Sequence, residues 1–99
     1  MASSKAHIPK HFHLMGHDIA VRRVPRTRWK YADALAYFDP SKMQIAICNG
    51  ISASALEQAF WHEATHAVLY VMGHELYTDE AFVDTFSGLV HQIITTAEG

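Results

Sequence analysis

Residues 56–72 read LEQAFWHEATHAVLYVM, and this stretch predicts the element around which the chain folds. Apolar side chains lie on nearly all sides of the helix that it favours, so we expect this helix to be central and covered. Ser52 or Ser54 is the predicted N-cap, since Ser54 and Glu57 fit a capping box, and Gly73 is the predicted stop. The helix should therefore end close to residue 72.

A second helix is predicted over residues 79–96, with Thr78 as its N-cap and two acids in its first turn, where the helix dipole favours them. Apolar residues at helical spacing predict its core face: Phe82, Phe86, Leu89, Val90 and Ile93. A polar row borders this face: Glu80, Asp84, Ser87 and His91. If the two helices pack side by side, the polar row is the place to expect a metal ligand.

The first half of the chain favours strands. Four β-favouring runs stand at residues 12–15, 19–24, 35–38 and 43–48, with turn residues between the members of each pair. The order of elements predicts an α+β fold: a small antiparallel sheet of three to four strands packed on two long helices. We expect a single domain over residues 1–99, with residues 1–9 as a loose N-terminus.

Composition narrows the classes of function. The net charge of −2 and the absence of a strongly basic surface argue against nucleic-acid binding. No apolar run approaches the roughly 18 residues of a membrane span, and the first residues do not resemble a signal peptide. The single cysteine, Cys48, allows no internal disulfide and fits a reducing compartment. We therefore expect a cytoplasmic protein; its oligomeric state is open.

His62, Glu63 and His66 carry the predicted chemistry. Residues four apart on a helix lie on one face, so both imidazoles can reach one ion, and zinc accepts histidine nitrogen in a tetrahedral site. Glu63 is rotated by about 100° from His62, which places its carboxylate beside an open metal position. There it can act as general base on a zinc-bound water. This is the content of the H-E-x-x-H pattern.

A catalytic zinc usually has three protein ligands and a water, so a third ligand is needed. Glu80, in the polar row of the second helix, is the leading candidate.

These residues resemble the gluzincin type of zinc metallopeptidase, through His62-Glu63-x-x-His66 followed by Glu80-x-x-x-Asp84. The likeness covers about residues 35–97 and is nearest to the short metallopeptidase-like domains often carried by phages, and to the protease core of the ImmA/IrrE group. It implies a minimal zincin core with one Zn²⁺ per chain in a cytoplasmic protein; a phage-encoded protein that acts in the host cytoplasm is one form that this resemblance allows. By this resemblance His62, His66 and Glu80 are ligands, Glu63 is the base, and Asp84 orients the first histidine from outside.

An SprT-like site, with His74 or His91 as third ligand, is the alternative at this stage. The transition-state-stabilising residue is open among three candidates: Tyr70, Tyr77 and His91. A second cluster of histidines, His7, His11, His13 and His17, shows no metal geometry in its spacing, although His11 and His13 would share a strand face.

The expected function is hydrolysis of peptide bonds in a polypeptide substrate that lies extended along a sheet edge, with residues 43–48 as the expected edge strand. One alternative is a zinc-binding regulatory module with the same fold and no turnover. The other is a metal-free structural domain in which the motif has arisen by chance.

Overall fold

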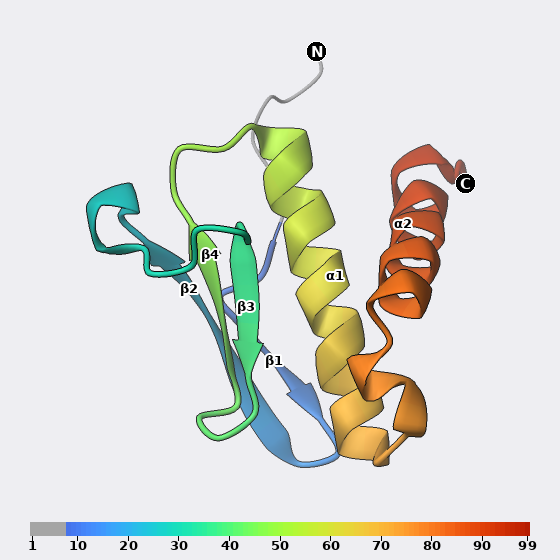
Figure 1. Cartoon of the computed structure of the whole chain (residues 1–99). Coiled ribbons are helices and arrows are strands. Elements are labelled where there is room, and N and C mark those ends of the chain that lie inside the picture. The colour runs from blue at the N-terminus through green and yellow to red at the C-terminus, as the bar shows by residue number, and fades with distance from the viewer. Residues whose placement is uncertain (1–7) are drawn as a thin grey trace.

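A computed structural model of the chain describes residues 8–99 and shows four strands followed by two long helices (Figure 1). The strands are β1 (His11–Leu14), β2 (His17–Val24), β3 (Ala36–Asp39) and β4 (Gln44–Cys48). The helices are α1 (Ala53–Met72) and α2 (Glu80–Thr96), with short 3₁₀ turns η1 (Arg26–Arg28) and η2 (Glu75–Thr78). The predicted α+β fold is therefore confirmed.

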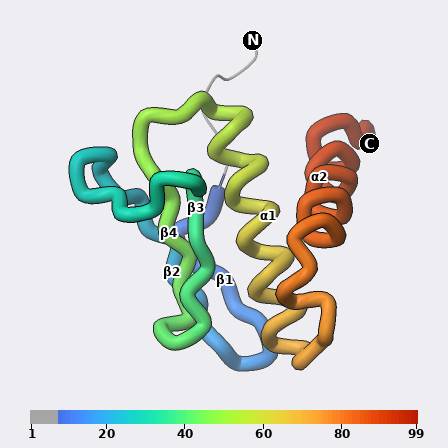
Figure 2. Tube along the Cα trace, viewed as in Figure 1, coloured from blue at the N-terminus to red at the C-terminus, as the bar shows by residue number. Residues whose placement is uncertain are grey.

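The sheet has the strand order β1-β2-β4-β3, in which β2 and β4 run parallel and the two outer pairs run antiparallel. The prediction of a wholly antiparallel sheet is wrong for this central pair. Figure 2 shows the path of the chain. After β2 the chain leaves the sheet and returns as β3 at the far edge, and β4 then lies between β3 and β2, parallel to β2. The expectation that residues 43–48 form an edge strand is therefore wrong: β4 (Gln44–Cys48) is internal, and the edge on this side of the sheet is β3.

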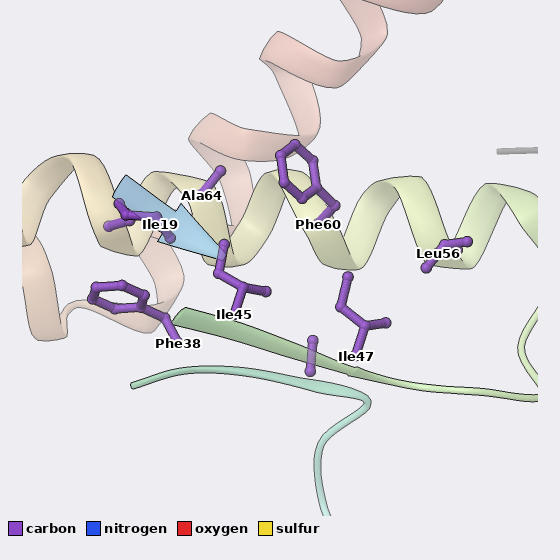
Figure 3. Packing of buried hydrophobic residues seen from close by; sticks show 9 residues of the cluster. Ile19, Phe38, Ile45, Ile47, Leu56, Phe60 and Ala64 are labelled. Atoms are coloured by element: carbon purple, nitrogen blue, oxygen red, sulfur yellow. The ribbon is translucent and has the colours of Figure 1, made fainter. Parts of the chain in front are cut away.

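The core lies between one face of the sheet and α1 (Figure 3). Ile45 and Ile47, both on β4, are fully buried. They contact the apolar side of α1, which contributes Leu56, Phe60 and Ala64. This burial explains why β4 is a central strand: neighbours on both sides remove the most apolar surface from water when the strand between them is the most apolar one.

Both ends of α1 are closed by local hydrogen bonds. The Ser52 hydroxyl accepts a hydrogen bond from the amide of Ala55 at 3.1 Å, so Ser52 and not Ser54 is the N-cap. Gly73 has a φ of 66° and ends the helix as predicted. The amide of His74 reaches back to Leu69 O, which turns the chain sharply toward η2.

α2 packs against α1, so that the sheet, α1 and α2 form successive layers (Figure 1). Its N-cap is Asp79, whose carboxylate accepts from the amide of Phe82 at 3.0 Å, one residue later than the predicted Thr78. The predicted core face is wrong in part, because Phe86, Leu89 and Ile93 are 49%, 57% and 65% exposed. The buried side chains of α2 are Val83 and Ser87. The side of α2 that meets α1 therefore carries Val83 together with Ser87 and His91, while Phe86, Leu89 and Ile93 lie toward solvent.

None of the helices within residues 8–99 is long and apolar enough to cross a membrane.

Candidate metal centre

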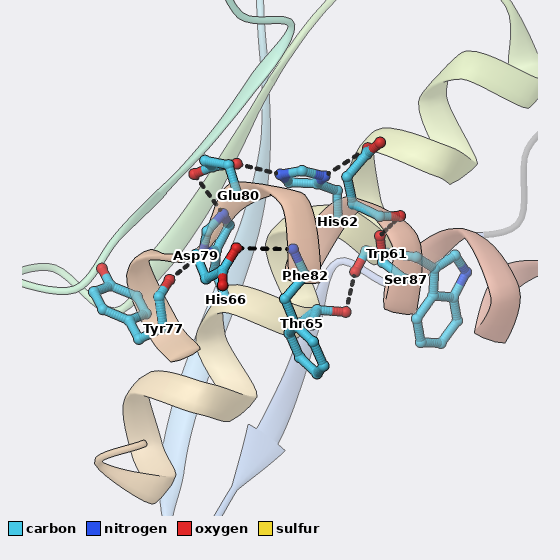
Figure 4. A network of polar contacts seen from close by, with 10 residues as sticks. Trp61, His62, Thr65, His66, Tyr77, Asp79, Glu80, Phe82 and Ser87 are labelled. Atoms are coloured by element: carbon cyan, nitrogen blue, oxygen red, sulfur yellow. Dashed lines mark hydrogen bonds and ion pairs between the residues drawn. The ribbon is translucent and has the colours of Figure 1, made fainter. Parts of the chain in front are cut away.

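α1 places His62 and His66 one turn apart with their ring centroids 5.1 Å from each other. Both rings turn toward the first residue of α2 (Figure 4). His62 Nε2 lies 3.0 Å from Glu80 Oε1, and His66 Nε2 lies 3.0 Å from Glu80 Oε2. The potential ligand atoms of these three residues all lie within 4.8 Å of one another.

The short connection between the helices brings Glu80 to this position. Gly73 reverses the chain, η2 carries it back along α1, and the Asp79 cap starts α2 beside the histidines. Glu80 stands in the first turn of α2 with its side chain 70% exposed, whereas the side chains of His62 and His66 are 21% and 11% exposed. The site is therefore open on the glutamate side and closed on the helix side.

The second nitrogen of each ring also has a partner. His66 Nδ1 lies 2.9 Å from the carbonyl oxygen of Tyr77, and His62 Nδ1 lies 3.4 Å from Asp84 Oδ1. A carbonyl oxygen only accepts, so His66 Nδ1 donates, and in the neutral ring this leaves the Nε2 lone pair free. Carboxylate and carbonyl partners of this kind fix the orientation of metal-binding histidines.

This donor set fits zinc. Two imidazole nitrogens and a carboxylate oxygen are among the ligands that zinc prefers, and bonds of about 2.0 Å in a tetrahedron place neighbouring ligand atoms about 3.3 Å apart. The 3.0 Å separations between the histidine nitrogens and the Glu80 oxygens are close to that edge length. His62, His66 and Glu80 are the residues that would hold the ion.

Glu63 lies next to this cluster and is buried, with 9% of its surface exposed. Burial raises the pKa of its carboxyl group, while the charges of His62 and His66 and a hydrogen bond from the backbone of Phe38 act in the opposite direction. The net result is a pKa above the ordinary value for glutamate. Such a group is well placed for both accepting and returning a proton.

A cleft of about 880 Å³ connects Glu63 and the histidines with the edge of the sheet. One wall is α1 with the start of α2, and the other is β3 with residues 33–35 before it. Tyr77 lines the cleft, and its ring centroid lies 5.7 Å from that of His66. Burial is the largest cause of a raised pKa for the Tyr77 hydroxyl, which therefore keeps its proton at neutral pH.

The other sequence candidates lie elsewhere. His74 Nδ1 accepts a hydrogen bond from the amide of Leu76 and so caps η2. His91 Nε2 lies 3.1 Å from Glu57 Oε1, between α1 and α2. Tyr70 is 42% exposed and packs on the rings of Phe38 and Tyr77. None of these three candidates lines the cleft.

The structure also brings together a group that sequence reasoning missed. His11 and His13 on β1 lie close to Asp18 on β2, and the three form a second set of potential metal ligands. The register of the hairpin, which pairs His13 with Asp18, was the signal that spacing along the sequence did not provide. His17 is not part of this set. His7 lies outside the described residues.

Comparison of the chain with protein-family models, with curated protein sequences and with solved structures found no match.

Proposed function

We propose that this chain is a zinc-dependent peptidase. The observation that carries the proposal is the convergence of His62, His66 and Glu80 beside a buried glutamate, in a cleft bordered by a sheet edge. The three ligand candidates come from two different helices, and Glu80 and Asp84 of α2 contact the histidines while Phe86, Leu89 and Ile93 of the same helix stay exposed. A structural domain gains little from such an arrangement, since exposed apolar side chains lose the free energy of burial.

A zinc ion held there would polarise the scissile carbonyl and lower the pKa of water. Glu63 is the general base: it takes a proton from the attacking water and returns it to the amine that leaves. Its raised pKa favours the second of these steps, because a carboxylic acid of higher pKa is still protonated closer to neutral pH. His66 and His62 are held in place by Tyr77 O and the Asp84 carboxylate.

The substrate would add to the sheet at β3. Among residues 8–99 this strand pairs with β4 on one side only, and its residues from Ala36 to Phe38 line the cleft. An extended polypeptide can form backbone hydrogen bonds to the free side of such a strand. We place the reacting peptide bond where the path along β3 passes Glu63, whose carboxylate also receives a hydrogen bond from Phe38.

Tyr77 is the candidate for stabilising negative charge on the carbonyl oxygen. Of the three sequence candidates it is the one that lines the cleft, and its hydroxyl stays protonated because its pKa is raised. A hydrogen-bond donor aimed at developing charge contributes about 10²–10³ to the rate in well-studied hydrolases.

The decisive experiment compares the parent with Glu63→Gln, both loaded with zinc, on fluorescently labelled unfolded casein and on a mixed peptide library. The variant keeps the shape of the side chain but cannot take up the proton, so cleavage should fall by about 10²- to 10⁴-fold. Zinc content, measured by elemental analysis, should stay unchanged. Glu75→Gln is the control, because Glu75 is an exposed glutamate on η2 outside the cleft. Equal cleavage by the Glu63→Gln variant and the parent would overturn the mechanism.

A second candidate is a zinc-binding regulatory module without turnover. The exposed apolar side chains of α2, among them Phe86 and Ile93, favour it, since apolar patches of this kind mark protein contacts. A parent protein that binds zinc in the cleft but cleaves neither substrate would select this candidate.

We further propose a reducing compartment, the cytoplasm, as the place of action. Cys48 is a free thiol, and cysteines without a disulfide are typical of proteins in reducing compartments.

A further inference from the structure

The outer side of the β1–β2 hairpin carries a second group of metal-binding side chains. His11 Nδ1 lies 3.3 Å from Asp18 Oδ1, and His13 Nε2 lies 3.4 Å from the same oxygen. The rings of His11 and His13 are 5.9 Å apart and nearly perpendicular. All three side chains are exposed, with exposed fractions of 61%, 65% and 63%.

The sheet itself creates this arrangement. Side chains two apart on a strand point to the same face, so His11 and His13 stand together while Phe12 between them turns to the core. There the ring of Phe12 lies 5.8 Å from that of Phe60 on α1. Asp18 is directly opposite His13 in the register of the hairpin. The cluster is thus on the face of the sheet opposite to α1.

We propose that His11, His13 and Asp18 bind a second divalent transition-metal ion, of the zinc and copper class. Two imidazoles and a carboxylate suit these ions, and the two nitrogen-to-oxygen distances of 3.3 and 3.4 Å match the edge of a tetrahedron with bonds of about 2.0–2.1 Å. Solvent fills the remaining position, since the site is on the surface. The ion joins β1 to β2 across the hairpin.

The hairpin has a reason to need such a link. Its two-residue turn consists of Met15, with φ of 48°, and Gly16, with φ of 87°. Turns of this kind favour Asn or Gly at both positions, so a methionine at the first position weakens the hairpin. Within the part of the chain that the structure describes, β1 has only β2 as a neighbour in the sheet. An ion that binds only the closed hairpin stabilises the folded state in proportion to its free concentration.

Zinc titration of the chain, expressed without a histidine tag, tests this site independently of the cleft. Equilibrium dialysis with elemental analysis should find two zinc ions per parent chain and one in the His13→Gln and His11→Gln variants. His17→Gln is the matched control: His17 is an exposed histidine on the same hairpin but outside the cluster, and its variant should keep both ions.

The cleft is removed in a separate background, His62→Gln with His66→Gln, which should keep one zinc ion. In that background, zinc-dependent shifts of the imidazole nitrogen resonances of His11 and His13 should appear in NMR spectra. Unchanged stoichiometry in the His11→Gln/His13→Gln double variant, or equal losses with His13→Gln and His17→Gln, would overturn the hairpin site. Full occupancy that survives loss of His62 and His66 would instead overturn the cleft site and leave the hairpin site standing.

Discussion

Two opposing influences act on the ionisation of Glu63. It is buried in the long helix, which disfavours its charged form, and it stands between two histidines whose charges favour that form. Burial is the larger influence, so the pKa of the carboxyl is raised. Sequence reasoning could place Glu63 beside the histidines from helical geometry, but the hydrogen bond from Phe38 comes from a strand far away in the sequence.

The raised pKa of Glu63 predicts how the stability of the metal-free protein depends on pH. Glutamates of the unfolded chain titrate near about 4.3. Between that value and the raised pKa the folded state binds more protons than the unfolded state, so the free energy of unfolding falls as the pH rises. Glu63→Gln removes this contribution. Urea denaturation in the presence of a chelator should show the parent losing stability relative to the variant as the pH rises above about 4.3, until Glu63 is ionised in the folded state as well. A difference that does not change with pH would contradict the prediction.

Asp84 acts on the site through His62. Its carboxylate lies 3.4 Å from His62 Nδ1, and its side chain is 75% exposed. We therefore expect its contribution to zinc affinity to be at the low end of the range for such partners. Asp84→Asn should weaken zinc binding at the cleft about tenfold, because the ring loses a partner that orients it and increases its basicity. Competition with a chromophoric chelator measures this, in a His13→Gln background. Asp33→Asn is the control, since Asp33 is an exposed acid that also lines the cleft. Equal losses in both variants would show a general effect of charge.

At the scale of the element, local signals predicted α1 well and α2 less well. Gly73 and the serine before Ala53 are short-range signals, and they describe the ends of α1 without reference to the rest of the fold. The orientation of α2 about its axis depends on its partner. Its apolar stripe predicted the core face, but Glu80 and Asp84 contact His62, His91 contacts Glu57, and three members of the stripe, Phe86, Leu89 and Ile93, stay exposed. No periodicity in α2 alone reports those contacts.

The choice of N-cap for α1 has a measurable consequence. Ser52→Ala removes the acceptor of the Ala55 amide and should lower the free energy of unfolding by about 1 kcal/mol. Ser54→Ala is the matched control, since Ser54 lies within the first turn and does not act as the cap. Urea denaturation of the two variants decides between them. A larger loss in Ser54→Ala would restore the capping box that the sequence suggested.

At the scale of the whole molecule, the strands were largely predictable and their order was not. Alternation along residues 43–48 identified a half-buried strand, and the turn at Asp39-Pro40 identified its hairpin partner. Two hairpins can join in several ways, and the burial of Ile45 and Ile47 on β4 decides the order that forms. The ligand residues were recognisable because the motif is local on α1 and Glu80 opens the next helix. The hairpin cluster was not recognisable from the sequence, because it depends on the register between two strands.

Two isoleucines, Ile47 and Ile93, test the layered arrangement of the sheet and the two helices. Ile47 is fully buried between the sheet and α1, whereas Ile93 on α2 is 65% exposed. Ile47→Ala should cost about 2–5 kcal/mol of unfolding free energy, and Ile93→Ala should change it by no more than about 0.5 kcal/mol. Denaturation at low protein concentration measures both. A large loss in Ile93→Ala would mean that α2 buries its apolar face after all.

The edge strand β3 is four residues long, which corresponds to about 13 Å of extended chain. A partner aligned there would be read mostly through its main chain, which is the same in every polypeptide. Selection among substrates would then depend on whether they are folded. The backbone amides and carbonyls of a folded protein are already hydrogen-bonded, whereas those of a denatured or nascent segment are free to pair with β3. Because β3 is short, we expect the protein to accept unstructured polypeptides of many sequences and to have little preference for any one of them.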